Sequence, residues 1–219
     1  GSLYSAHNMT VVVAGNVHVE GMFSEIEKHF GDVEKFETKE FLPIKELQEK
    51  YEVAIKHKKT EQAHFALGVR TVGTENEKDR YPLSILASIL GGGMSSRLFY
   101  EVRERRGLSY YVKTSADHYA GAGYLATYVG ADPKRIDEAI KVVVEEYSKV
   151  SQKGEITKEE LIKAKEYTKG HFVLELEDTR SAAILYATQE ILENKIENPK
   201  EIMEKIEGVT MVDVERVAK

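Results

Sequence analysis

The segment Ile89–Val112 has the sequence ILGGGMSSRLFYEVRERRGLSYYV, and it carries the clearest information on the fold. Three consecutive glycines, Gly91–Gly93, end an apolar helix, because glycine tolerates the positive φ that a helix C-terminus often adopts. Ser95 or Ser96 then supplies a capping oxygen for a second helix. Gly107 ends that helix, and the aromatic and β-branched residues after it predict a strand. The segment therefore predicts two helices followed by a strand.

The second helix is expected over Ser96–Arg105 and is amphipathic. Leu98 and Val102 share one stripe, which we expect to face the core. Charged residues spaced four apart share another stripe, which we expect to face water. These charged residues are Arg97, Glu101 and Arg105. Phe99 and Arg103 share a third face, at the edge of the apolar stripe.

Apolar and alternating patterns predict strands in the first part of the chain and helices in the second part. The expected strands are Met9–Gly15, Tyr51–Lys56, His64–Val72, Ser109–Tyr119 and Gly123–Val129. We expect the first to be buried on both faces, and the last two to form a hairpin around Ala120-Gly121-Ala122. The expected helices are Glu20–Phe30, Tyr81–Leu90, Ser96–Arg105, Pro133–Gln152, Lys158–Glu177, Thr179–Asn194, Pro199–Ile206 and Met211–Lys219. This order predicts an α+β fold, a two-layer sandwich in which helices cover one face of a sheet.

Composition limits the class of protein further. The 219 residues, 42% of them hydrophobic, can form one large domain or a domain with a fragment. The net charge of −6 argues against a nucleic-acid partner, and no apolar run is long enough to predict a membrane span. The chain has no cysteine, which excludes thiolate metal sites and fits a reducing compartment, so a cytoplasmic location is expected.

The segment GGGMSSRLFYEVRERRGLSYYV closely resembles the signature of the C-terminal half of pitrilysin/insulinase-type zinc peptidases. These enzymes, the inverzincins, include the processing peptidases. Further segments resemble family landmarks and extend the resemblance over nearly the whole chain. They are NMTVVVAGNV, TEQAHFALG and GVTMVDVERVAK. The resemblance implies a mixed, mostly antiparallel sheet. It also implies that Arg103 and Tyr110, seven residues apart, bind the substrate carbonyl and the developing oxyanion when this half closes over the active site.

The chain departs from the family in its metal ligands. It contains no H-x-x-E-H motif, and no two of its seven histidines lie closer than seven residues. We therefore expect no metal ligand in this chain, and we expect zinc to be bound by a missing N-terminal half. The chain alone should be inactive, and its expected partners are that zinc-binding half and a peptide substrate.

The glycines Gly91, Gly92 and Gly93 allow two interpretations. No Gly-Lys-Ser/Thr follows them, so they do not form a phosphate loop. They could serve only as a helix C-cap between two packed helices. Because a glycine-rich loop handles substrate in the related processing peptidases, they are also candidates for substrate binding.

The resemblance also predicts a division of the chain. Residues 1–30 would be the last strand and helix of a preceding domain, with a tag remnant at Gly1-Ser2, and residues 31–50 would be a linker. Residues 51–219 would be the C-terminal peptidase-family domain without its final strand. An open sheet edge invites strand pairing, so Met9–Gly15 is expected to fill it, in cis or in a strand-swapped homodimer.

Two other functions remain open from the sequence. The chain could be a catalytically inactive core-type structural subunit that acts in assembly. It could also be a peptide-binding module of the same fold that adds a peptide strand to its sheet edge. The presence of both Arg103 and Tyr110 argues against a purely structural role.

Overall fold

The computed structural model describes residues 2–39 and 41–219, which form two compact units. Unit 1 comprises Gly1–Ile44 and Phe172–Asn198. Unit 2 comprises Lys45–His171 and Pro199–Lys219, and it contains the three strands of the described chain.

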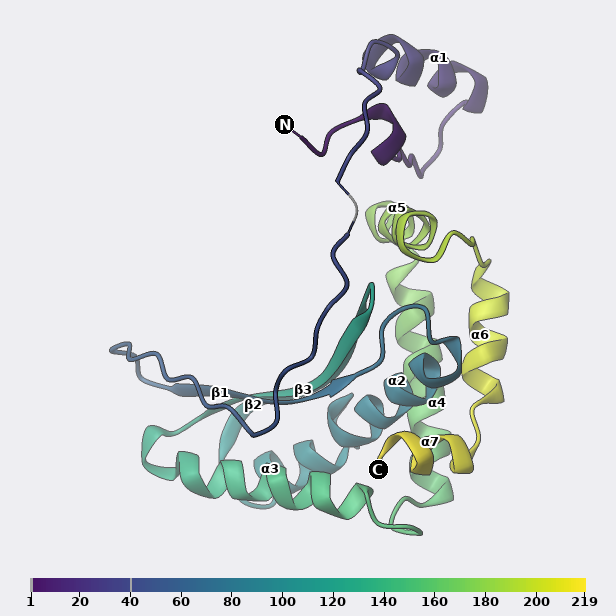
Figure 1. The fold of residues 1–219 in the computed structure, drawn as a ribbon. Coiled ribbons are helices and arrows are strands. Elements are labelled where there is room, and N and C mark those ends of the chain that lie inside the picture. The colour runs from purple at the N-terminus through teal and green to yellow at the C-terminus, as the bar shows by residue number, and fades with distance from the viewer. Residues whose placement is uncertain (1, 40) are drawn as a thin grey trace. The chain divides into compact units, whose positions relative to one another are not determined.

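Apart from two predicted strands that do not form, the helices and strands follow the predicted order (Figure 1). The elements up to Ala131 are η1 (Ala6–Asn8), α1 (Val19–Phe30), β1 (Ala63–Thr71), α2 (Glu77–Gly91), the π-helix η2 (Phe99–Glu104), β2 (Ser109–Tyr119) and β3 (Ala122–Ala131). The later elements are η3 (Pro133–Arg135), α3 (Ile136–Val150), α4 (Lys158–Glu175), α5 (Thr179–Thr188), the π-helix η4 (Gln189–Glu193), α6 (Pro199–Gly208) and α7 (Met211–Val217).

The sheet of unit 2 has the strand order β1-β3-β2, and both pairings are antiparallel. β2 and β3 form the predicted hairpin, whose turn contains Gly121 at a φ of +77°. The predicted α+β class is therefore confirmed. The family resemblance had implied a mixed sheet. This expectation is wrong for the described chain, because every strand pair in it is antiparallel.

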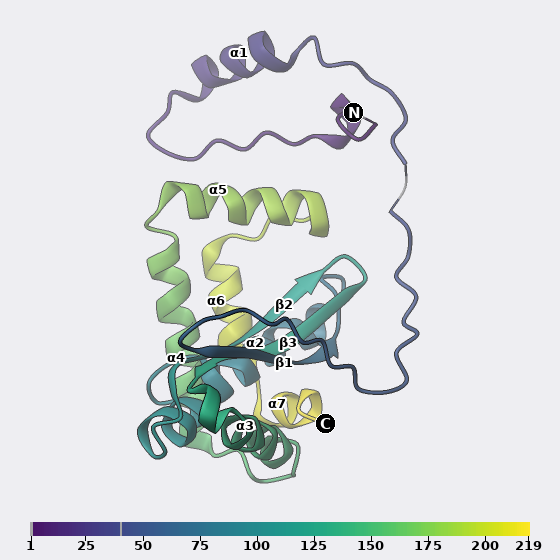
Figure 2. The same ribbon diagram turned by 90° about the vertical axis from the view of Figure 1, so that its left-hand side faces the viewer.

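One face of the sheet packs against α2 and α3, which lie on the same side of it (Figures 1 and 2). Leu125 and Val129 of β3 are buried together with Ile85 and Leu90 of α2. Side chains alternate across a strand, so Ala126 and Tyr128, which lie next to these buried residues in the sequence, face away from the core. Helices thus cover one face, as predicted, and the other face carries exposed side chains.

A buried polar chain joins this core to α3. The hydroxyl oxygens of Thr114 and Thr127 lie 2.7 Å apart, and that of Thr127 lies 2.9 Å from the hydroxyl oxygen of Tyr147. Burial raises the pKa of Tyr147 to about 12. These hydrogen bonds fix the position of the hairpin on α3, since leaving such groups buried without partners is unfavourable.

Two predicted strands are wrong. Met9–Gly15 and Tyr51–Lys56 pair with no strand in the described chain. The first is not buried on both faces, since Val13 is 43% exposed, and in the second Tyr51 is 91% exposed. An apolar or alternating run forms a strand only where another strand supplies hydrogen-bond partners, and the local sequence does not show whether one is available. The expected pairing of Met9–Gly15 with the sheet edge in cis is therefore absent, and the swapped dimer stays a prediction.

Unit 1 is held together by few contacts. The Ser5 hydroxyl donates to the Phe36 carbonyl at 2.7 Å and accepts from the Phe36 N–H at 2.9 Å. The predicted amphipathic helix is confirmed as α1, but none of its residues is buried. Its apolar side lines a hollow of about 160 Å³. The lining residues are Val11, Val13, Val17, Val19, Met22, Phe23 and Ile26.

Candidate functional site

Arg103 lies on η2, which is a π-helix rather than the expected α-helix. The Arg105 N–H donates to the Tyr100 carbonyl at 2.8 Å, five residues back in the chain. Gly107 then ends the helix, as predicted, with a φ of +57°. π-Helical turns are rare and frequently occur at functional sites, so the backbone itself distinguishes this position.

The apolar stripe of this helix anchors it in unit 2. Leu98 and Val102 are fully buried, as predicted. Arg97, however, does not face water: its side chain is 14% exposed, and its Nε lies 2.6 Å from Oε1 of Glu160 on α4. The expectation was wrong because the partner carboxylate is 63 residues away and meets Arg97 only in the folded chain.

The Arg103 guanidinium is exposed and lies over the Phe99 ring, 4.8 Å from its centroid. The neighbouring Arg105 and Arg106 both bond to Glu101. Arg103 has no ion pair with any residue that the structure describes. Phe99 therefore orients the side chain, while its hydrogen-bond donors stay available to a ligand.

Tyr110 lies at a bulge in β2. Ser109 pairs with Ala131 and Tyr111 pairs with Gly130, so Tyr110 has no partner in the ladder. Its side chain is 76% exposed, and its hydroxyl makes no hydrogen bond within residues 2–39 and 41–219. A bulge re-aims a side chain out of the regular alternation, and such bulges are common next to active sites.

The structure brings these two residues onto adjoining elements, since η2 and β2 contact one another. A single short connection, Arg105–Leu108, joins the elements. These two elements thus present a guanidinium and a hydroxyl, both of which are hydrogen-bond donors.

All three candidate glycines lie at closely packed positions. A Cβ at Gly91 would lie 2.6 Å from the Thr114 backbone nitrogen on β2, and one at Gly93 would lie 2.8 Å from the Tyr167 ring. Side chains at these positions would push α2 away from β2 and the following turn away from α4.

The expected reason for glycine at the end of α2 is wrong. Gly92 is the C-cap residue, and its φ is −80° rather than positive. A Cβ there would instead lie 2.6 Å from the Ser88 Cα. Ser96 does not cap the next helix with its side chain either, since its hydroxyl donates to the Gly93 carbonyl at 2.6 Å. The substrate role of the three glycines stays a prediction.

The described residues do not fit a zinc site. No group of three or more His, Cys, Asp or Glu side chains in this part of the chain could hold a metal ion. Within residues 2–39 and 41–219, no helix has the length and apolar character needed to cross a membrane.

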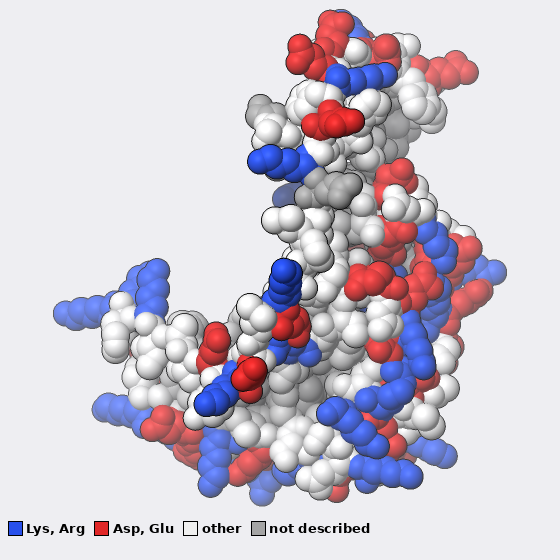
Figure 3. Space-filling view, viewed as in Figure 1, with Lys and Arg blue, Asp and Glu red and all other residues white. Residues whose placement is uncertain are grey.

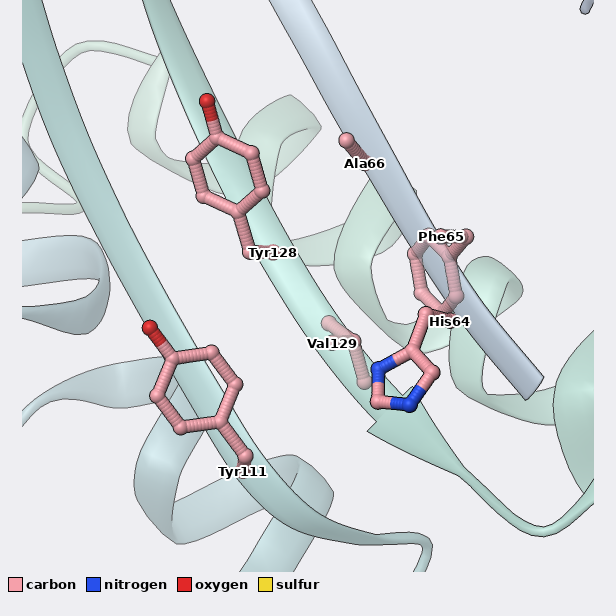
Figure 4. Close-up of a pocket in the computed structure, with 6 residues that line it drawn as sticks. All are labelled: His64, Phe65, Ala66, Tyr111, Tyr128 and Val129. Carbon is pink, nitrogen blue, oxygen red and sulfur yellow. The ribbon is translucent and has the colours of Figure 1, made fainter. Parts of the chain in front are cut away.

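A second feature was only partly visible in the sequence. The exposed face of the sheet contains a hollow of about 440 Å³ (Figure 4). Its lining residues are His64, Phe65, Ala66, Tyr111, Tyr128 and Val129. The alternation within each strand could assign the tyrosines to one face. The register between the three strands, which aligns these residues, could not be predicted from the sequence of any one strand.

Residues 2–168 match the family model described as the peptidase M16 inactive domain. The chain belongs to the M16 peptidase family. This match confirms the predicted resemblance to the non-zinc, C-terminal half of a zinc peptidase.

The relatives of this M16 domain are about twice as long as the chain. An uncharacterized zinc protease of Mycobacterium tuberculosis (strain H37Rv) is 34% identical over 219 residues, which cover 99% of this chain and 50% of the relative. One of Bacillus subtilis is 32% identical, covering 99% of this chain and 52% of the relative. The chain therefore spans about half the length of the curated relatives it matches.

Solved structures share the fold of this M16 domain. A protease from Helicobacter pylori has a TM-score of 0.75 at 25% identity, covering 94% of this chain and 50% of that one. An M16 inactive domain from Pseudomonas fluorescens has a TM-score of 0.64 at 21% identity, covering 72% of this chain and 37% of that one.

Proposed function

We propose that this M16 domain is the non-zinc half of a zinc metalloendopeptidase, and that Arg103 and Tyr110 bind the carbonyl oxygen of the scissile peptide bond. The observation that supports the assignment is that both side chains are exposed on adjoining elements and lack hydrogen-bond or ion-pair partners within the described chain. A purely structural subunit would have no use for two unpaired donors at neighbouring backbone irregularities.

The proposed chemistry follows from the charge that develops during peptide hydrolysis. Attack on the carbonyl carbon moves negative charge onto the carbonyl oxygen. The Arg103 guanidinium can donate one hydrogen bond to this oxygen, and the Tyr110 hydroxyl can donate a second. Removing one such donor typically lowers kcat by about 10²–10³-fold.

The zinc ion itself is proposed to belong to the other half of the enzyme. The family relatives are named zinc proteases, whereas this chain offers no metal cluster within its described residues. Its proposed partners are therefore the zinc-binding half and a peptide substrate held between the two halves.

The division of the chain is also a proposal. We assign residues 1–30 to the preceding domain, residues 31–50 to a linker and residues 51–219 to the C-terminal domain. The exposed apolar side of α1 and the unpaired Met9–Gly15 support this division, because both would be covered by a preceding domain. The lack of cysteine supports a cytoplasmic location.

A reconstitution experiment tests the proposed function. This chain is mixed with the zinc-binding half of the same enzyme, and the cleavage of a fluorogenic peptide is followed. Activity should require both halves, and each should be inactive alone. Full activity of the zinc-binding half alone would instead favour the structural, core-type alternative.

A further inference from the structure

The hollow on the exposed face of the sheet is built by three neighbouring strands. His64 of β1 and Tyr111 of β2 both pair with Gly130 of β3, one from each side. Tyr128 lies two residues before Gly130 and projects from the same face. Figure 4 shows the two tyrosine rings and the imidazole around a common space.

Gly130 lies at the bottom of this hollow, where a side chain would fill part of the space. A Cβ at Gly130 would lie 3.1 Å from the His64 Cε1 and 3.2 Å from its Nδ1. Ala66 contributes only a methyl group beside it. The volume of about 440 Å³ and the aromatic walls suit a large planar side chain, since offset and edge-to-face aromatic contacts are favourable.

The surroundings of the hollow are basic. Lys113 pairs with Tyr128 in the β2–β3 ladder and is exposed on the same face. Three more exposed lysines lie in the segment just before β1. They are Lys56, Lys58 and Lys59, and their region projects at the left edge of Figure 3. β1 begins at Ala63, which pairs with Ala131, next to the His64–Gly130 pair of the hollow.

These four lysines have no ion pair within the described residues, and Glu61 is the one acidic side chain of their segment. At the other end of the same face, the positive charge of Arg70 is already compensated, since its Nη1 lies 2.7 Å from Oε2 of Glu46. The lysines at the end of the face that holds the hollow thus lack ion pairs among the described residues, whereas Arg70 at its other end has one.

We propose that the hollow binds a large aromatic side chain of the peptide substrate and that the four lysines attract acidic residues flanking it. This inference rests on the proposed function, because it assigns the class of peptide that the enzyme takes. Aromatic walls alone could also hold a cationic side chain. The surrounding lysines disfavour that occupant, because like charges repel one another.

Peptide binding to the 219-residue chain alone tests the inference without any need for activity. The probes are blocked pentapeptides in which a central residue lies between two glutamates on each side. The central residue is phenylalanine, alanine or lysine, and a fourth peptide has phenylalanine between glutamines. Binding is followed by amide NMR shifts of the labelled chain.

The phenylalanine–glutamate peptide should shift the signals of His64, Tyr111, Tyr128 and Gly130 saturably. Its Kd should be lower than that of the alanine peptide by roughly tenfold. Replacing the glutamates by glutamines should weaken binding and remove its salt dependence. Equal binding of the alanine peptide, tighter binding of the lysine peptide, shifts elsewhere or no saturable shift would each overturn the inference.

Three variants locate the effect. Gly130→Val fills the floor and Tyr128→Ala removes a wall, so both should abolish the preference for phenylalanine over alanine. Tyr119→Ala removes a tyrosine from β2 at the far end of the same sheet face, and it should leave the preference unchanged. The binding experiment contains no zinc-binding half. An absence of peptide binding would therefore contradict this inference and leave the proposed roles of Arg103 and Tyr110 intact. Peptide binding without activity in the reconstitution would contradict only the catalytic proposal.

Discussion

Arg103 and Tyr110 lie seven residues apart, and each occupies a break in regular backbone structure: a π-helical turn for the arginine and a strand bulge for the tyrosine. Such irregular backbone is less stable than a regular helix or ladder and is concentrated at functional sites. The two breaks flank the Gly107 turn, so one short segment sets the directions of both side chains.

The first prediction concerns Gly91. Gly91→Ala should lower the free energy of unfolding by about 2 kcal/mol, because the added Cβ meets the Thr114 backbone, which cannot move aside as a flexible side chain could. Gly170→Ala in α4 is the matched control, since nothing lies within 4 Å of its Cβ position. It should stabilise the fold by roughly 0.5–1 kcal/mol. Urea unfolding measures both.

This pair of variants also separates the two interpretations of the glycines. If packing is the reason for Gly91, the variant should lose stability while the KM of the reconstituted enzyme stays unchanged. A variant as stable as the wild type with a raised KM would contradict the packing explanation and favour a substrate role.

The second prediction concerns the ion pair beneath η2. Arg97 joins Glu160 of α4 and lies 3.9 Å from the buried Glu146 of α3. Arg97→Met should lower the free energy of unfolding by about 2–3 kcal/mol, less than for a fully buried pair because Glu160 is partly exposed. Lys141→Met is the control, because its pair with Glu145 is exposed, and it should change stability by under about 0.5 kcal/mol. Equal effects would show that the Arg97 pair contributes no more than a surface pair.

The third prediction is a loss of stability in acid. The hydrogen bond from Arg106 lowers the pKa of Glu101. Burial would raise the pKa of Glu160, but the hydrogen bonds from Arg97 and Thr157 outweigh burial, and the pKa lies below its usual value. Because both carboxyls have lower pKa values in the folded chain, their contribution is complete above the unfolded pKa of about 4.3 and is lost as pH falls below it.

Unfolding in urea between pH 6 and pH 3 measures this loss. The wild type should lose stability steeply below about pH 4.3. Arg97→Met should show a shallower slope, because Glu160 then lacks the larger of the two hydrogen-bonding partners that lower its pKa. Identical slopes in the two proteins would show that Glu160 does not carry the acid sensitivity.

The sequence predicted the elements whose signals are local. The hairpin turn at Gly121, the end of η2 at Gly107 and the amphipathic stripe of Leu98 and Val102 all lie where periodicity and glycine placed them. α2 nevertheless begins before the expected Tyr81. Asn76 caps the helix by accepting a hydrogen bond from the Asp79 N–H at 3.2 Å. The first turn of α2 is polar, so a prediction based on apolar periodicity did not include it.

What depends on distant partners could not be predicted in this way. Tyr51–Lys56 alternates like a strand but has no neighbour to pair with in the described chain, and Arg97 meets its carboxylate only after folding. The candidate site divides in the same manner. The resemblance of the surrounding segment to a known family suggested Arg103 and Tyr110 as candidates. The π-helix and the bulge on which they lie leave no local signal in composition or periodicity.

We propose that Arg103 and Tyr110 donate to the same oxygen, and a double-mutant cycle on kcat in the reconstituted enzyme examines this proposal. Arg103→Ala and Tyr110→Phe should each lower kcat by about 10²-fold with unfolding free energies unchanged, since both side chains are exposed. The double variant should lose less than the product of the two effects, because the donors share one charge. A kcat within twofold of the wild type in both single variants would contradict the account.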